Sequence, residues 1–275
     1  MRIYLMTDLE GVAGVLNFEE WTSPGKFHYL TARELLTQEI NAAVDGFFAG
    51  GATSVLVVDA HGPCGVNIRE LDSRADLSRG WPDETWPLGV DAGFDAVAWV
   101  GQHAKACTPY GHLCHTQSLD YIDETVNGIS IGEFGELAMC ASEVGVRAIF
   151  GSGDEAFTKE AQALVPGIET VAVKQGLRAS TGADLDVDAY TRHVGSARHT
   201  HPVRAREAIR AGAQRAVERA KRESFGIIPL TAPFTRVVKL RRGPRRPYAT
   251  VMKVTHPSSF IGVMRKWSKE KPVAG

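Results

Sequence analysis

Acidic and imidazole side chains occur in this sequence shortly after apolar runs. They are Asp8, Glu10, Asp59, His61 and His103. Asp8 and Glu10 stand two residues apart, as do Asp59 and His61, so each pair points to one side of an extended chain. Carboxylate and imidazole groups without thiolate suit Zn²⁺, Mn²⁺ or Fe. Such a set can hold two ions about 3.5–4 Å apart, with one carboxylate bridging, and this arrangement is suited to hydrolysis.

The apolar runs are typical of strands, and helical patterns alternate with them. The expected strands are residues 2–7, 54–58, 95–100, 146–150 and 169–173. The expected helices are residues 28–48, 133–143, 155–164 and 202–222, the last with Gly212 off its apolar face. This alternation predicts an α/β fold with a mainly parallel or mixed sheet flanked by helices.

The polar residues that follow these strands should meet in space. In open α/β sheets the carboxyl ends of parallel strands share one edge, and ligands bind there. Lys174 follows the strand at 169–173 and should join the same edge. We therefore expect a metal site at the carboxyl ends of the strands.

Each of these residues also has a simpler interpretation when it is taken alone. An Asp after a strand is commonly a turn residue, and Asp8 and Asp59 could also cap helices. Glu133 stands where a helix should begin, and an acid there complements the helix dipole. A single histidine is more often structural than a ligand. The delivery of acids and imidazoles to one edge by three strands is what indicates metal binding.

Composition narrows the class of protein. The chain has 275 residues, 44% of them hydrophobic, and a formal net charge of −1, which does not favour nucleic acid or membrane as a partner. We expect no leader segment or membrane span, and reduced thiols in a cytoplasmic protein. The basic stretch 241–247 is interpreted as a solvated loop. Residues 1–180 should form the metal-binding core, and residues 181–275 a helical and irregular part packed on it as one unit.

Several short stretches together point to a known family. They are TDLEGVAGV (7–15), YLTARELLTQEINAAV (29–44), VLVVDAHG (55–62), VGQHAKACTP (100–109), CHT (114–116), NGISIGEFG (127–135) and VAVKQ (171–175). In order and spacing the sequence resembles the M55 peptidases, the D-aminopeptidase family. The resemblance implies an aminopeptidase with two zinc ions per subunit, acting on short peptides and assembled as a ring-like homodecamer.

The resemblance also implies roles for individual residues. The metal ligands would be Asp8, Glu10, His61, His103 and Glu133, and the catalytic histidine would be His115. Asp59 would orient His61 from behind. Lys174 could bind a carboxylate, stabilise an oxyanion, or pair with acids near the site. The segment before His115 is one residue longer than expected and contains His112, while Cys114 is interpreted as a packing residue.

Two other functions compete with this interpretation. Sets of Asp and His also serve other dimetal hydrolases, such as phosphoesterases and amidohydrolases. Alternatively, the chain could be a non-catalytic peptide-binding protein linked to dipeptide transport. The C-terminal residues 241–275 lack the long closing helix that the family resemblance predicts, so substrate selection and assembly depend on a segment that the sequence alone does not explain.

Overall fold

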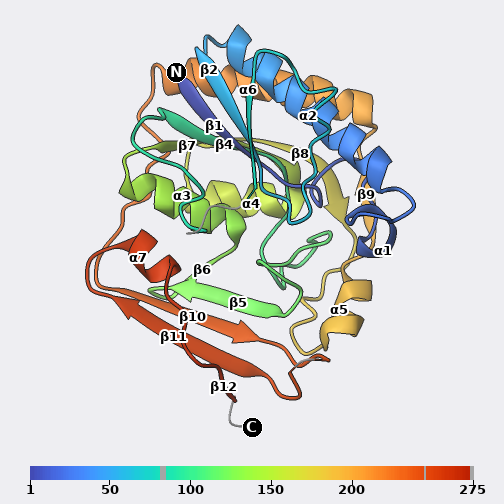
Figure 1. Cartoon of the computed structure of the whole chain (residues 1–275), viewed down its shortest axis with the longest axis vertical. Coiled ribbons are helices and arrows are strands. Elements are labelled where there is room, and N and C mark those ends of the chain that lie inside the picture. The colour runs from blue at the N-terminus through green and yellow to red at the C-terminus, as the bar shows by residue number, and fades with distance from the viewer. Residues whose placement is uncertain (81–84, 245, 273–275) are drawn as a thin grey trace.

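A seven-stranded sheet forms the centre of the computed structural model, which describes residues 1–80, 85–244 and 246–272 (Figure 1). Its strands are β1 (Arg2–Thr7), β2 (Ser54–Asp59), β3 (Asp76–Arg79), β4 (Ala96–Gln102), β7 (Arg147–Asp154), β8 (Glu169–Gly176) and β9 (Ala197–His199). The order is β3-β2-β1-β4-β7-β8-β9, and the pairing is parallel except between β8 and β9. The mainly parallel sheet and its five predicted strands are confirmed, and the short edge strands β3 and β9 are additional.

Four long helices cover the two faces of this sheet (Figure 1). They are α2 (Tyr29–Ala49) and α6 (Pro202–Ala220) on one face, and α3 (Glu133–Glu143) and α4 (Glu155–Leu164) on the other. All four were predicted, with ends displaced by at most two residues. Three shorter helices are α1 (Phe18–Trp21), α5 (Val187–His193) and α7 (Phe260–Met264). None of the helices in the described ranges combines the length and apolar character that a membrane crossing needs.

The helices pack through the apolar faces that their sequences define. On α2, Leu36, Ile40 and Phe47 are fully buried, and the helix ends at Gly50. On α6 the expected apolar face is buried as well, but Gly212 belongs to it. A Cβ at Gly212 would lie 2.7 Å from Cγ2 of Val171, so the missing side chain lets α6 approach the sheet closely. The expectation that Gly212 lies off this face is therefore wrong.

A second, antiparallel sheet covers the side of the molecule beyond α3 (Figure 1). Its strands are β5 (Tyr121–Val126), β6 (Ile129–Ile131), β10 (Phe234–Leu240), β11 (Thr250–His256) and β12 (Lys271–Pro272), in the order β12-β11-β10-β5-β6. The expected helical and irregular character of residues 181–275 misses β10, β11 and β12, and β5 and β6 were not among the strands expected before residue 180. Because β10 pairs with β5, the sheet is built from both sides of residue 180.

The basic stretch at 241–247 is only partly the solvated loop that was expected. Arg242 is exposed, but Arg241 is buried, with its guanidinium carbon 3.7 Å from the centre of the Tyr190 ring. Arg241 also donates to the backbone carbonyls of Gly182 at 2.9 Å and Leu185 at 3.0 Å. Through these contacts Arg241, which directly follows β10, links the second sheet to the segment around α5. Arg245 lies outside the described residues.

Candidate metal centre

The five predicted ligands converge at the carboxyl ends of the parallel strands. Asp8 and Glu10 lie in the segment after β1, His61 follows β2, His103 follows β4, and Glu133 is the first residue of α3. Each of the first four is at most 7% exposed, which is unusual for ionisable side chains and requires compensating partners.

Two glycines allow the strand ends to approach so closely. A Cβ at Gly11 would lie 2.1 Å from the carbonyl oxygen of Gln102, and a Cβ at Gly101 would lie 1.9 Å from that of Asp8. Gly101 also has φ +76°, a conformation that side chains disfavour. The amide of Gly11 donates to the Gly101 carbonyl at 2.7 Å. The backbones that carry Asp8 and His103 are therefore in direct contact.

Asp8 occupies the middle of the cluster. Its Oδ1 lies 3.1 Å from Nδ1 of His61, and its Oδ2 lies 3.0 Å from Nε2 of His103. The two oxygens of one carboxylate thus face two different imidazoles. This is the arrangement that a carboxylate bridging two ions requires.

Glu10 lies on the His61 side of Asp8. Its Oε2 is 3.1 Å from Nδ1 of His61, the same nitrogen that faces Asp8. This oxygen is buried and makes no hydrogen bond of good geometry within the described residues. One imidazole nitrogen therefore has two carboxylates at similar distances, and it can give a hydrogen bond to only one of them at a time.

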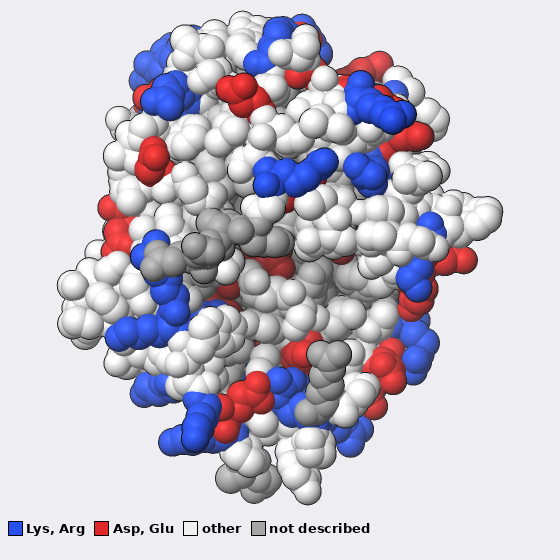
Figure 2. Space-filling model, viewed as in Figure 1, with Lys and Arg blue, Asp and Glu red and all other residues white. Residues whose placement is uncertain are grey.

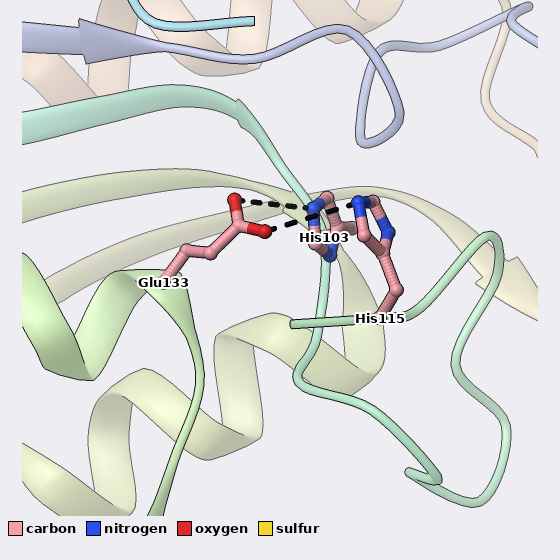
Figure 3. Close-up of side chains that lie close together, drawn as sticks. All are labelled: His103, His115 and Glu133. Atoms are coloured by element: carbon pink, nitrogen blue, oxygen red, sulfur yellow. Dashed lines mark ion pairs between the residues drawn. The ribbon is translucent and has the colours of Figure 1, made fainter. Parts of the chain in front are cut away.

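Glu133 and His115 lie on the His103 side (Figure 3). Oε2 of Glu133 is 3.5 Å from Nε2 of His103, and Oε1 is 3.8 Å from Nε2 of His115. The rings of His103 and His115 stack with their centroids 4.0 Å apart. Nε2 of His103 is buried and, like Oε2 of Glu10, lacks a hydrogen bond of good geometry in the described part of the chain.

All three histidines are oriented by backbone carbonyls. His61 donates through Nε2 to the carbonyl of Thr22 at 2.8 Å. His103 donates through Nδ1 to Ala104, and His115 through Nδ1 to Leu113, both at 2.9 Å. Because a carbonyl can only accept, each ring presents its other nitrogen to the acids. Metal-binding histidines show this pattern, in which the second nitrogen fixes the orientation of the ring.

In this cluster the pKa values of His61, His103 and Asp8 depend strongly on the charges of their neighbours. Burial alone would lower the pKa of His61 and His103, but the nearby carboxylates reverse this and raise the pKa of both imidazoles well above the ordinary value. Burial likewise opposes ionisation of Asp8, yet the two imidazoles beside it, His103 and His61, hold its pKa well below the usual range. The site is thus built for carboxylates that remain ionised beside a concentrated positive charge.

A divalent metal ion fits these observations. One group of ligand atoms comes from Asp8, Glu10 and His103, and within it every atom lies within 4.8 Å of the others. A second such group comes from His103, His115 and Glu133. The two orphaned atoms, Oε2 of Glu10 and Nε2 of His103, are both potential ligands. Oxygen and imidazole nitrogen without thiolate match the ligands of zinc in hydrolytic sites.

The cluster opens into a cleft of about 340 Å³. Figure 2 shows a hollow across this face of the molecule with acidic side chains inside it. Apolar side chains form part of the wall, namely Met6, Phe18, Trp86, Leu88 and Leu119. Among the described residues that line the cleft there is no lysine or arginine. The cleft therefore offers a small ligand apolar contacts and an acidic floor.

Two further predicted residues lie elsewhere. Asp59 accepts from the amides of Gly65 at 2.7 Å and Val66 at 3.1 Å, and from the guanidinium of Arg79 at 3.0 Å. It thus shapes the segment that follows His61, and the structure does not bring it to the imidazole that it was expected to orient. Lys174 is buried on the far side of the segment after β1 and donates to backbone carbonyls, so it does not reach the cleft.

Two other residues of the 103–115 segment, His112 and Cys114, lie outside the cleft. His112 is fully buried and donates through Nε2 to the carbonyl of Leu16 at 2.9 Å, away from the cleft. Sγ of Cys114 lies 3.3 Å from the hydroxyl of Tyr190, and burial raises the pKa of the thiol to about 11. Cys114 therefore packs as an unreactive thiol, as predicted.

The sequence did not reveal Gln117, which supports Glu133. The amide of Gln117 donates to Oε1 of Glu133 at 2.7 Å, and its side chain donates to Oε2 of Glu136 at the same distance. Gln117 adopts φ +59° and lines the cleft. The carbonyl partners of the histidines were missed as well, because backbone groups leave no trace in the residue pattern.

Comparisons with known proteins identify the family. Residues 1–258 match the family described as Peptidase_M55: D-aminopeptidase. The D-aminopeptidase of Bacillus subtilis (strain 168) is 31% identical over 185 residues; the alignment covers 66% of this chain and 66% of the relative, about two thirds of its length.

A solved structure shares the fold. It is described as "Zn-dependent D-aminopeptidase DppA from Bacillus subtilis, a self-compartmentalizing protease", and it matches with a TM-score of 0.82 and 21% identity over 96% of this chain and 95% of its own. The family match at residues 1–258 extends over the seven-stranded sheet and over all strands of the second sheet except β12. The chain therefore belongs to the M55 peptidases, the D-aminopeptidase family.

Proposed function

We propose that this protein is a zinc-dependent aminopeptidase that releases N-terminal D-amino acids from short peptides. The observation that carries the proposal is the position of Asp8, whose two carboxylate oxygens face His61 on one side and His103 on the other. A carboxylate so placed suits a pair of ions. Family membership and the relatives named above support the D-aminopeptidase activity and the choice of zinc.

Five side chains would hold the two zinc ions. Asp8 would bridge them, with Glu10 and His61 on one side and His103 and Glu133 on the other. When bound, the ions supply Lewis-acid activation of the peptide carbonyl that is to be attacked. The carbonyl groups that fix the imidazoles keep the ligand nitrogens aimed at the cluster, so little reorganisation is needed on binding.

His115 would perform proton transfer. Its Nδ1–H is committed to the Leu113 carbonyl, so Nε2 carries a lone pair that faces the cleft and Glu133. From this position Nε2 can accept a proton from the water that attacks the peptide carbonyl, and it can then return that proton to the leaving amine. Its edge-on contact with Phe18, with centroids 5.6 Å apart, restricts the ring from the other side.

The walls of the cleft favour a substrate with a free amine. The acidic floor attracts a cationic α-amino group, and the apolar wall residues can hold a small aliphatic side chain. Apart from the metal ions, a phosphoester would find no lysine or arginine in the described lining to bind its phosphate oxygens. The same lining thus supports an aminopeptidase over a phosphoesterase.

We further propose that the protein acts as a homo-oligomer, with a decamer as the expected assembly, in the cytoplasm. The related solved structure is described as a self-compartmentalizing protease, which implies an enclosed assembly of copies. All four cysteines of this chain are free, as a reducing compartment would keep them. Light scattering on the purified protein tests the assembly, and a stable monomer at micromolar concentration would refute it.

One experiment tests the activity. Protein stripped with a chelator and reloaded with zinc is assayed against matched D- and L-aminoacyl peptides and a phosphomonoester. We expect release of the N-terminal amino acid, faster for the D-peptides, only after zinc is restored. Cleavage of the phosphoester alone would support a phosphoesterase, and peptide binding without turnover would support the non-catalytic alternative.

A further inference from the structure

The segment that carries the first two ligands is held by side chains from distant parts of the chain. We call residues 8–16, which include Asp8 and Glu10, the ligand loop. Four buried or half-buried polar side chains contact its backbone: Glu39 of α2, His112, Lys174 of β8 and His199 of β9. None of the four lines the cleft. They therefore act on the ligand loop from the side opposite the substrate.

Lys174 makes the central contact. Its ammonium group donates to the carbonyl of Glu10 and, at 3.2 Å, to the carbonyl of Val15. One cation thus joins two points of the ligand loop that are five residues apart. The side chain is only 3% exposed, and burial lowers its pKa to about 8 against the opposing effect of nearby carboxylates. A buried ammonium is costly to maintain, and its charge strengthens each hydrogen bond that it gives.

The remaining contacts fix the part of the ligand loop between these two carbonyls. Oε1 of Glu39 accepts from the amide of Ala13 at 2.9 Å, and Nδ1 of His199 accepts from the next amide, that of Gly14, at 3.0 Å. Glu39 is 1% exposed. Backbone groups that secondary structure normally satisfies are here satisfied by side chains. The course of this backbone therefore depends on those side chains.

This dependence has a consequence for the carboxylate of Glu10. Lys174 binds the carbonyl of the same residue whose side chain faces His61, so it fixes the backbone from which that carboxylate is aimed. Sites of this kind must be held to within a fraction of an ångström to function well. Outside the ligand loop, the side chain of His103 donates a hydrogen bond to the carbonyl of Ala104, and that of Glu133 accepts one from the amide of Gln117.

We propose that Lys174 is a positioning residue of the metal centre, which holds the ligand loop at the carbonyl of Glu10 so that the carboxylate of Glu10 faces the ion on the His61 side, and that Glu39 supports the same loop through Ala13. This inference rests on the proposed metal centre. It predicts an asymmetric defect: loss of Lys174 weakens the ion held by Glu10 and His61, and spares the ion held by His103 and Glu133.

The test compares Lys174→Met with the unsubstituted protein. Methionine keeps the length of the side chain and cannot donate to either carbonyl. Zinc content and affinity are measured by equilibrium dialysis against a competing chelator. We expect one of the two ions to bind about 10–100-fold more weakly, the usual effect of losing a group that orients a ligand, and the other to bind unchanged. Lys159→Met, at an exposed lysine on α4, is the matched control and should bind both ions normally.

A second pair of variants keeps the test decisive if Lys174→Met fails to fold. Glu39→Gln retains a carbonyl oxygen that can accept from Ala13, whereas Glu39→Met has a similar length and no such acceptor. We expect Glu39→Gln to bind zinc like the unsubstituted protein and Glu39→Met to weaken the same single ion. Equal zinc binding by both Glu39 variants would contradict the supporting role of Glu39.

Amide hydrogen exchange separates positioning from a general loss of stability. In Lys174→Met, exchange should accelerate at residues 9–16 and remain slow in β4 and β7. Equal weakening of both ions together with faster exchange throughout, or two ions with unchanged affinity, would overturn the proposal. If the unsubstituted protein binds no zinc, the metal centre itself is refuted. If the unsubstituted protein and Lys174→Met both bind two zinc ions with the same affinity, the metal centre stands and the proposed role of Lys174 is refuted.

Discussion

His103 and His115 stack face to face, with their planes inclined by 15° and both Nε2 atoms directed toward Glu133. The two imidazoles nevertheless differ in their surroundings. His103 is 2% exposed and also faces Asp8, whereas His115 lines the open cleft and carries Phe18 at its edge. In this stack His103 is the inner, buried ring, and His115 is the ring that a substrate can meet.

The first prediction concerns His115. If its role is proton transfer, His115→Ala should lower kcat by a factor of about 10²–10⁴ and leave two zinc ions bound. His193→Ala, at a histidine on α5 that does not line the cleft, is the control and should retain full activity. Steady-state kinetics and zinc analysis on the same samples decide the role. Loss of an ion together with activity would instead make His115 a metal ligand.

The second prediction follows from the bridging position of Asp8. Asp8→Asn should lose both ions, because each oxygen of the carboxylate faces a different half of the site. Asp59→Asn should retain both, since Asp59 is bonded to the 65–66 amides and Arg79. Elemental analysis after dialysis gives the ion count. Retention of one tightly bound ion by Asp8→Asn would show that Asp8 serves only one position.

The third prediction is that zinc binding releases protons. In the metal-free protein the carboxylates raise the pKa of His61 and His103, so both imidazoles hold protons at neutral pH, whereas a ligand nitrogen must be free. Affinity should therefore rise with pH. Calorimetric titration at pH 7 in buffers of different ionisation enthalpy measures the number of protons released. An identical heat in every buffer would contradict the prediction.

The fourth prediction concerns acid stability and His112. Burial lowers the pKa of this imidazole to about 2, so the unfolded chain takes up a proton near pH 6.5 that the folded chain refuses. The free energy of unfolding should thus fall as pH drops below about 6.5, by about 2 kcal/mol between pH 7 and pH 5 from this one group. His112→Gln should remove that share of the pH dependence. Urea unfolding of both zinc-saturated proteins at pH 7 and pH 5 tests this. An equal fall in the free energy of unfolding between the two pH values in both proteins would refute the prediction.

The fifth prediction addresses the second sheet. Arg236 and Glu124 form a two-pronged ion pair at 2.8 and 3.0 Å, and both side chains are at most 1% exposed. Arg236→Met should lower the free energy of unfolding by about 3–5 kcal/mol, because it leaves a buried carboxylate without its partner. Arg210→Met, which breaks an exposed pair with Asp45, should cost less than about 1 kcal/mol. A comparable cost for the two variants would contradict this interpretation.

The sequence was sufficient to predict the parallel sheet and the meeting of the acidic and imidazole side chains that follow its strands. The strands that carry Asp8, His61 and His103 are short, almost fully apolar runs because they are buried on both faces, and helices with clear apolar stripes separate them. The convergence of their polar ends then follows from topology alone. Glu133 required the family resemblance, since an acid at the start of a helix has an ordinary explanation.

The second sheet could not be predicted in this way. β10 contains Arg236, and a buried arginine becomes intelligible only beside Glu124, which lies 112 residues earlier in the chain. The contact of Lys174 could not be predicted for the same reason, because the carbonyl of Glu10 that it binds is 164 residues away in the chain. Pairings over such distances depend on the assembled fold, and local residue patterns do not record them.

The late position of β10 in the chain also affects the order in which the protein can fold during synthesis. All five proposed metal ligands lie within the first 133 residues, so the ribosome has made them by the midpoint of the chain. His115 lies just before β5, and β5 pairs on one side with β10 at Phe234–Leu240. The segment that carries His115 is held by residues that are made later still than the ligands: the amide of Leu113 donates to the carbonyl of Val194, and the hydroxyl of Tyr190 donates to the carbonyl of Cys114. A nascent chain would therefore contain every proposed metal ligand before Lys174, which holds the ligand loop, and before these residues that hold the His115 segment. A truncated product that stops before residue 234 would lack the Arg236 that pairs with the buried Glu124.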